Sequence, residues 1–145
     1  MEGGKYAFAF STGMAAIVTM LSLLKKEDHL LIIDDVYAGT QRYLRKVFGP
    51  QTGIAWDLID FTDLKHVEES FKENTRFCWI ESQTNPTMKC VDIAAVGKIC
   101  KKKGVTLIID NTFMSPVLVN PLALGADVVI HSLTKYIGGH SDVTG

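Results

Sequence analysis

The chain has 145 residues, of which 47% are hydrophobic and 21% charged, so it is long and apolar enough to fold as one domain around a buried core. Its formal net charge of −1 gives no basis for expecting a nucleic-acid or membrane partner. No signal peptide is visible, and no run reaches the roughly 18 apolar residues of a membrane span, so we expect a cytoplasmic protein.

The cysteines and histidines do not have the spacing of a disulfide framework or a metal centre. Cys78, Cys90 and Cys100 form no CxxC pair, and each lies in an apolar stretch, so we expect three reduced and buried thiols. The four histidines form no HExxH or similar ligand pattern, so no metal site is expected.

The first predicted elements are a short aromatic strand at residues 6–10 and a helix over residues 13–24. A Ser-Thr-Gly turn joins them. A strand, such a turn and a helix N-terminus together form an arrangement that binds phosphate. Plain N-capping of the helix by Ser11 or Thr12 explains the same residues, so the local sequence leaves both interpretations open.

Strands and helices alternate along the rest of the chain. Short apolar runs followed by Gly, Pro, Asn or Asp predict buried strands, and Asp63 and Asp92 precede helical runs as N-caps. Gly49-Pro50 is predicted to close the helix that begins near Gly39. The expected strands cover residues 29–33, 54–61, 76–81, 106–109 and 127–131, and the expected helices cover residues 39–48, 64–71 and 93–103.

This alternation predicts an α/β fold, a mostly parallel sheet with helices on both faces. Ligands bind beyond the carboxyl ends of the strands in such sheets. Tyr37 and Asn85 follow strand ends, where a ligand contact, simple packing or a turn would each explain them. Asp110 follows four apolar residues, so it is costly to bury without a cationic partner, although a cap or turn role also fits.

Lys135 lies just past the last predicted strand, between two hydroxyl side chains and a glycine pair. A lysine that attacks a carbonyl needs a sheltered pocket that lowers the pKa of its amine. Ser132 and Thr134 could bind a phosphate, and Gly138-Gly139 would let the backbone come close to it. A structural lysine in a strand-end turn fits the local sequence as well.

Residues 132–142 read Ser-Leu-Thr-Lys-Tyr-Ile-Gly-Gly-His-Ser-Asp. This segment resembles the cofactor-lysine signature of the Cys/Met metabolism enzymes that depend on pyridoxal phosphate, Ser-x-Thr-Lys-aromatic-aliphatic-x-Gly-His-Ser-Asp. Residues 110–116 and 121–127 resemble the same family, in its cystathionine γ-lyase branch. Gly138 departs from the asparagine of most members. The resemblance implies a type I pyridoxal-phosphate fold, with residues 1–145 as the central part of its large domain and without the N-terminal arm and small C-terminal domain.

The resemblance also implies roles for single residues. Lys135 would bind the cofactor covalently, Asp110 would pair with its protonated ring nitrogen, and Tyr37 would stack on its ring, so these three form the implied catalytic set. Asn85 would contact the ring hydroxyl, and Thr112 would pack near the ring. The role of Glu81 stays open. The implied cofactor-binding residues are Gly13, Met14, Tyr37, Asn85, Asp110, Thr112, Ser132, Thr134 and Lys135.

The implied activity is a lyase step of transsulfuration that converts cystathionine to cysteine, 2-oxobutyrate and ammonia. The implied partners are sulfur amino acids (cystathionine, cysteine or homocysteine) and three further copies of the chain in a homotetramer. A cystathionine γ-synthase or methionine γ-lyase shares these motifs, and a non-catalytic fragment that retains the cofactor-binding core is a further alternative. A nucleotide-binding domain is disfavoured because no GxGxxG or Walker pattern occurs. We expect the 145 residues alone to be inactive.

Overall fold

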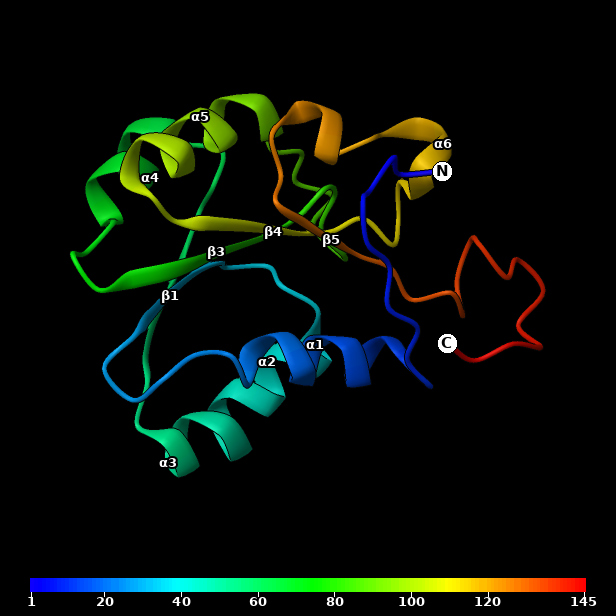
Figure 1. The fold of residues 1–145 in the computed structure, drawn as a ribbon, viewed down its shortest axis with the longest axis horizontal. Coiled ribbons are helices and arrows are strands. Elements are labelled where there is room, and N and C mark those ends of the chain that lie inside the picture. Colours follow the sequence, from blue (N-terminus) through cyan, green and yellow to red (C-terminus); the bar gives the residue numbers. More distant parts are fainter.

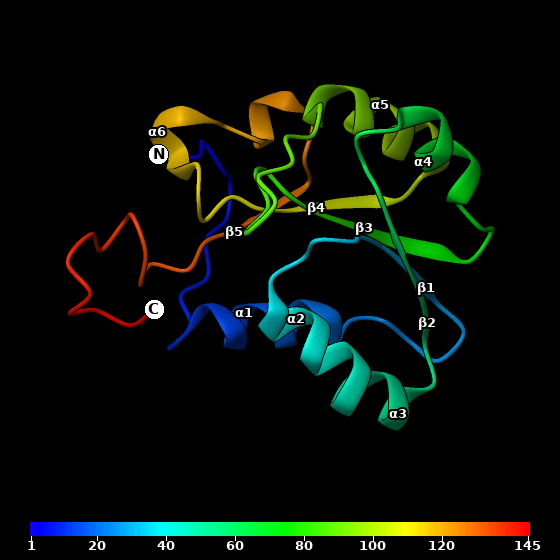
Figure 2. The same ribbon diagram turned by 180° about the vertical axis from the view of Figure 1, so that it is seen from behind.

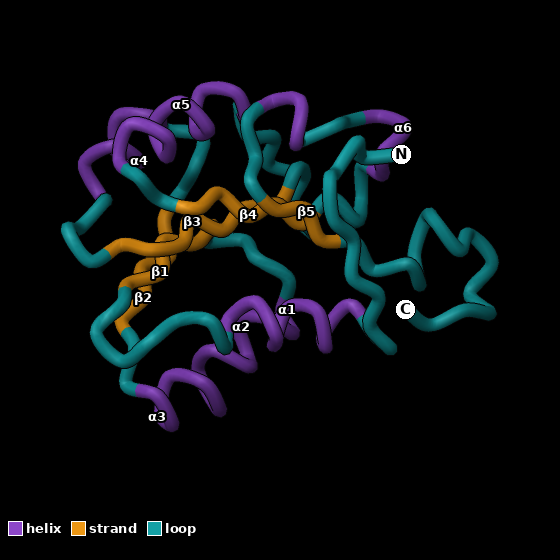
Figure 3. Tube along the Cα trace, viewed as in Figure 1, coloured by secondary structure: helices purple, strands orange, loops and turns teal.

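A computed structural model describes all 145 residues, and its centre is one sheet of five parallel strands in the order β2-β1-β3-β4-β5 (Figure 1). Figure 3 shows these strands as a single layer with helices above and below it. The arrangement confirms the predicted fold class. The strands are β1 (His29–Ile33), β2 (Ala55–Ile59), β3 (Thr75–Glu81), β4 (Thr106–Asp110) and β5 (Val128–Ile130).

The helices divide between the two faces of the sheet in both views (Figures 1 and 2). The first three lie on one face, and the next two lie on the other. A short helix follows β4 near the edge of the sheet. None of the helices is both long and apolar enough to cross a membrane. The helices are α1 (Gly13–Leu21), α2 (Ala38–Tyr43), α3 (Gly49–Thr52), α4 (Leu64–Ser70), α5 (Ile93–Lys103) and α6 (Ser115–Leu118).

The buried core lies along the inner strands, because helices remove both of their faces from water. All five residues of β1 are buried, and Trp79 of β3 is fully buried. This explains why the inner strands are continuous apolar runs that do not alternate with polar residues. Local caps fix where the helices begin: Asp63 accepts from Lys65 and His66 N–H groups, and Asp92 accepts from Ala95 N–H.

The predicted strand at residues 6–10 is wrong, because this segment is extended but pairs with no other strand. The Glu2 carboxylate attaches the start of the chain instead, 3.0 Å from Asn111 Nδ2 and 2.6 Å from His131 Nε2. Side-chain contacts therefore replace a strand ladder here. Tyr6 and Phe8 are 74% and 82% exposed, so the aromatic character of the segment does not reflect burial in this sheet.

The predicted helix stop at Gly49-Pro50 is also wrong. A π-helical stretch, Leu44–Phe48, joins α2 to α3, and the helix ends at Gly53 with a φ of 71°. Pro50 occupies the first turn of α3, where a proline is tolerated. Gly49 is required for packing, since a Cβ at this position would collide with the ring of Trp56. The glycine therefore marks a close contact between α3 and the start of β2.

The prediction of three buried thiols is wrong for one cysteine. Cys78 and Cys100 are buried, whereas Cys90 is exposed. Cys90 lies in the loop between β3 and α5, and the apolar residues that follow it turn inward without it. Burial raises the pKa of the Cys78 thiol well above its usual value, and a hydrogen bond with Cys100 acts in the same direction.

Candidate functional site

A cavity of about 250 Å³ lies beyond the carboxyl ends of the inner strands, where a parallel sheet binds its ligands. It brings together all nine residues that the sequence predicts as a binding site, although they are spread over more than 120 positions. Glu81 and Phe113 also line it. The nine predicted residues are Gly13, Met14, Tyr37, Asn85, Asp110, Thr112, Ser132, Thr134 and Lys135.

The N-terminus of α1 forms one end of the cavity. Thr12 caps this helix, and its hydroxyl oxygen accepts from Ala15 N–H at 3.0 Å. The N–H groups of Gly13 and Met14 have no acceptor within the chain, as expected in a first helical turn. A Cβ at Gly13 would lie 2.9 Å from Ser132 Cβ, so the glycine lets the helix approach that strand-end loop. Capping and anion binding are thus compatible at this helix end.

The hydroxyl groups of Ser132 and Thr134 stand at the same end of the cavity. They lie 3.5 Å and 3.3 Å from the carbonyl oxygen of Gly145, which also accepts from Leu133 N–H at 2.8 Å. Three donors of this loop therefore converge on one oxygen atom. The loop donors bond to Gly145, whereas the two N–H groups of α1 are free, and free N–H groups at a helix N-terminus suit a phosphate.

Asp110 ends β4, lines the cavity and is half-buried. Its Oδ1 accepts from Thr112 N–H at 3.1 Å and from the Thr112 hydroxyl at 2.5 Å, whereas Oδ2 has no donor. Burial raises the pKa of Asp110, and the two bonds from Thr112 oppose that shift. The turn role and the ligand role considered from the sequence therefore involve different oxygen atoms of the same carboxyl group.

Glu81 is a buried acid that lies directly beside Asp110 in the register of β3 and β4. Burial raises its pKa to about 8, although Tyr37 N–H donates to Oε1 at 2.6 Å, and the charges of Asp110 and Asp35 raise it further. No lysine or arginine pairs with either acid. The two carboxyl groups form a site that a bound cation would stabilise.

Sequence reasoning left Glu81 without a role. A carboxylate that ends an apolar strand was the available signal, but its meaning depends on the register that puts it beside Asp110. Phe113 was missed as well, and it packs edge to face against Tyr136 at a centroid distance of 6.1 Å.

Three further side chains reach the cavity without a hydrogen-bond partner in the chain: the phenol of Tyr37, the amide of Asn85 and the amine of Lys135. Tyr37 is 48% exposed at the mouth, and its ring packs against Gly39, where a Cβ would collide with it. Lys135 follows β5 in the loop that also carries Ser132. The polar atoms of these three groups are therefore free to contact a ligand in the cavity.

Comparison with known proteins agrees with this geometry. Residues 1–145 match the family described as Cys/Met metabolism PLP-dependent enzyme. A putative cystathionine gamma-lyase 2 from Caenorhabditis elegans is 50% identical over 145 residues, which cover 99% of this chain and 37% of the relative. A cystathionine beta-lyase from Coxiella burnetii is 43% identical over 145 residues, which cover 100% of this chain and 38% of the relative.

The fold is also similar to a solved structure. A cystathionine gamma-lyase from Lactobacillus plantarum, complexed with L-serine, superimposes with a TM-score of 0.95 at 42% identity, over 99% of this chain and 37% of that chain. The chain thus spans less than two fifths of the length of these three proteins. On the match over its whole length, the chain belongs to the Cys/Met metabolism family of enzymes that depend on pyridoxal 5′-phosphate.

Proposed function

We propose that the cavity binds pyridoxal 5′-phosphate and that a protein containing these residues is a carbon–sulfur lyase of transsulfuration. One observation carries the proposal: an anion-binding helix end, an acid pair without a cation and an unpaired lysine face the same cavity. These groups match the phosphate, the ring nitrogen and the aldehyde of that cofactor. The residues present therefore fit the group that the family requires.

The phosphate would be held by the N–H groups of Gly13 and Met14 and by the hydroxyls of Ser132 and Thr134. The two N–H groups have no acceptor in the chain, whereas the two hydroxyls would exchange the Gly145 carbonyl oxygen for the phosphate. The positive end of the α1 dipole adds to the attraction.

The ring would lie between Tyr37 and the strand ends, with Thr112 beside it and the Asn85 amide at its hydroxyl group. Asp110 Oδ2 has no other donor, so it can hold a proton on the ring nitrogen. When bound, the cofactor supplies an electron-withdrawing ring for the reaction of an amino acid. Lys135 Nζ is the amine that would bind the cofactor covalently and then move protons on the substrate.

Among the possible activities, we propose γ-cleavage of cystathionine to cysteine, 2-oxobutyrate and ammonia. Support comes from residues 110–116 and 121–127, which resemble the γ-lyase branch, and from the 50% identity to a relative named for that activity. A second candidate is β-cleavage, which the 43% identical relative favours. Assay of 2-oxobutyrate against pyruvate separates the two, because only γ-cleavage forms 2-oxobutyrate.

We also propose a homotetramer, a cytoplasmic location and a place for residues 1–145 within a large cofactor-binding domain. The exposed apolar side chains of Val117 and Leu118, at 84% and 72%, support burial against further protein. The coverage of 37% of a relative supports the larger domain. Size measurement of a longer chain that contains residues 1–145 tests the assembly.

Lys135 is expected to be the lysine that binds the cofactor, because its amine is unpaired and faces the cavity. Incubation with excess pyridoxal phosphate, borohydride reduction and peptide mapping should label this residue and leave Lys89, which pairs with Asp34 and Asp60, unlabelled. Lys135→Ala should abolish the label. Label centred on any other lysine would contradict the assignment.

Asp110→Asn is expected to retain the cofactor but to lower turnover about a hundredfold or more in an active protein that contains this chain, since an amide cannot keep the ring nitrogen protonated. Loss of one such charge interaction costs on the order of 3 kcal/mol in the transition state. Steady-state kinetics with a bound-cofactor spectrum measures both effects, and turnover close to wild type would exclude the role.

Glu81 is expected to lower the free energy of unfolding as the pH rises from about 4.5 to about 8. Between these values the folded chain holds one proton more than the unfolded chain, so stability falls by on the order of a few kcal/mol and then levels off. Glu81→Gln keeps the acceptor for Tyr37 N–H but removes the titration, so urea unfolding of this variant should show a smaller decline. The exposed acid Glu68, replaced by Gln, is the control.

The 145 residues alone are expected to bind the cofactor weakly and to form no 2-oxobutyrate above background. Most of the length of the relatives has no counterpart in this chain. A poorly held substrate forfeits much of the ~7–11 kcal/mol that positioning supplies. Steady turnover of cystathionine by the homogeneous 145-residue chain would show this expectation to be wrong.

A further inference from the structure

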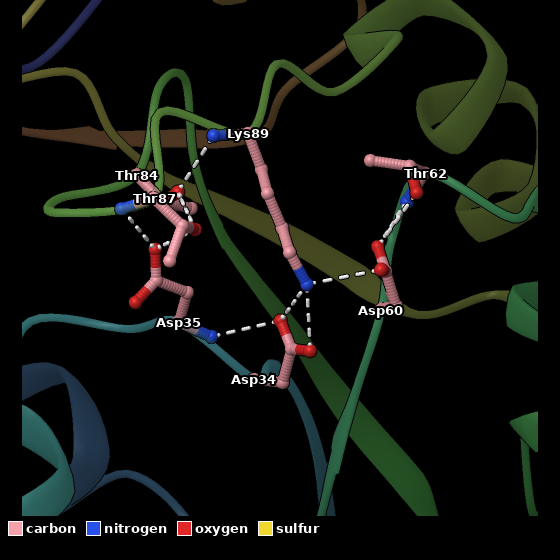
Figure 4. Close-up of polar contacts among 7 residues, drawn as sticks. All are labelled: Asp34, Asp35, Asp60, Thr62, Thr84, Thr87 and Lys89. Carbon is pink, nitrogen blue, oxygen red and sulfur yellow. Dashed lines mark hydrogen bonds and ion pairs between the residues drawn. The ribbon is translucent and has the colours of Figure 1, made fainter.

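A network of acids around one lysine lies beside the cavity, at the carboxyl ends of β1 and β2 (Figure 4). Asp34 follows β1 and Asp60 follows β2. Lys89 Nζ lies 3.0 Å and 2.8 Å from the two carboxylate oxygens of Asp34 and 2.9 Å from Asp60 Oδ2. Because Lys89 comes from the loop between β3 and α5, its ammonium group connects three separate segments.

The same loop is attached to β1 a second time. Thr87 N–H donates to Asp35 Oδ2 at 3.1 Å, and the Thr87 hydroxyl donates to the same oxygen. Within the loop, Lys89 N–H donates to the Thr84 hydroxyl at 2.9 Å, and Thr84 N–H donates to the Lys89 carbonyl at 3.1 Å. Figure 4 shows Thr87 beside Asp35, and Lys89 between Asp34 and Asp60.

Lys89 is the only cation in this network. The pKa of Asp60 falls to about 2, first because Thr62 N–H donates to it and next because Lys89 does. Hydrogen bonds to Asp34 and Asp60 raise the pKa of Lys89 itself. Without the ammonium group, the carboxylates of Asp34 and Asp60 would have no counter-charge between them. Their repulsion would favour separation of the three segments.

Asn85 connects the network to the cavity. It is the one residue of the loop, residues 82–92, that lines the cavity, and its side-chain amide has no partner in the chain. No side-chain contact fixes that amide, so its place depends on the backbone between Thr84 and Thr87. The network fixes that backbone.

We propose that Lys89 is a positioning residue, which ties the loop to Asp34 and Asp60 and so holds the Asn85 amide at the cavity wall for the cofactor. The proposal rests on the proposed function for the identity of the ligand. The clamp itself, between the loop and two strand ends, is a property of the chain without ligand. These two parts can be tested separately.

The clamp is tested first, without cofactor, by amide hydrogen exchange of Thr84, Thr87 and Lys89. In Lys89→Met these amides should exchange about tenfold faster or more, while amides of β3 keep their rates. Lys102→Met is the matched control, because it removes the 2.9 Å ion pair to Glu68 on the far helix layer. Asp60→Asn, which keeps the Asp34 pair, should give a smaller change in the same direction and serves if Lys89→Met does not fold. Unchanged loop exchange in both variants would overturn the proposal.

The link to Asn85 is tested by a double-mutant cycle on pyridoxal phosphate affinity, followed by absorbance. Lys89→Met should weaken binding about tenfold in the wild-type background and less than about twofold in Asn85→Ala, because the two changes act through one contact. Lys89→Arg should restore most of the affinity. Equal losses in both backgrounds would overturn the positioning role. If a longer unaltered protein that contains residues 1–145 takes up no pyridoxal phosphate, the proposed function fails, and the exchange measurement still decides the clamp.

Discussion

The parallel pairing of β3 with β4 places Glu81 beside Asp110, and the electrostatics of the cavity depend on this pair. A buried and a half-buried carboxyl group in register cannot both ionise without a large desolvation and repulsion cost. Glu81 avoids part of this cost by keeping its proton to about pH 8. For Asp110, two hydrogen bonds from Thr112 offset part of the cost of ionisation. The sheet therefore contains an acidic site, whose charge a protonated ring of a bound ligand would neutralise.

The pair of Glu81 and Asp110 is also linked by a hydrogen bond to Tyr37, at the entrance of the cavity. Glu81 accepts the Tyr37 N–H, so the residue at the mouth is placed by an acid at the base. The charge of Asp35 also raises the pKa of Glu81, and Asp35 holds the loop that carries Asn85 through Thr87. Residues that belong to different strand ends are thus coupled through carboxyl groups. A change in the charge of Asp35 therefore changes the pKa of Glu81.

Sequence reasoning succeeded where the signals are local. Asp63 and Asp92 begin helices because a carboxylate accepts from the next turn, and this needs no knowledge of the remaining chain. The nine site residues came from strand ends and from a resemblance to a known signature. The failures depend on tertiary packing: residues 6–10 have no strand to pair with, and Gly49 packs against Trp56 of the following strand. The Lys89 network joins residues up to 55 positions apart, so no local pattern could indicate it.

One hydroxyl group connects Asp110 to the loop that carries Ser132. Thr112 Oγ1 donates to Asp110 Oδ1 at 2.5 Å and accepts from Ser132 N–H at 2.9 Å. These two hydrogen bonds therefore fix the position of Asp110 relative to the loop that carries Ser132. This fixed geometry limits the dimensions of a ligand that can contact both groups. A molecule whose cationic nitrogen and anionic arm do not match those dimensions can contact one group, but not both.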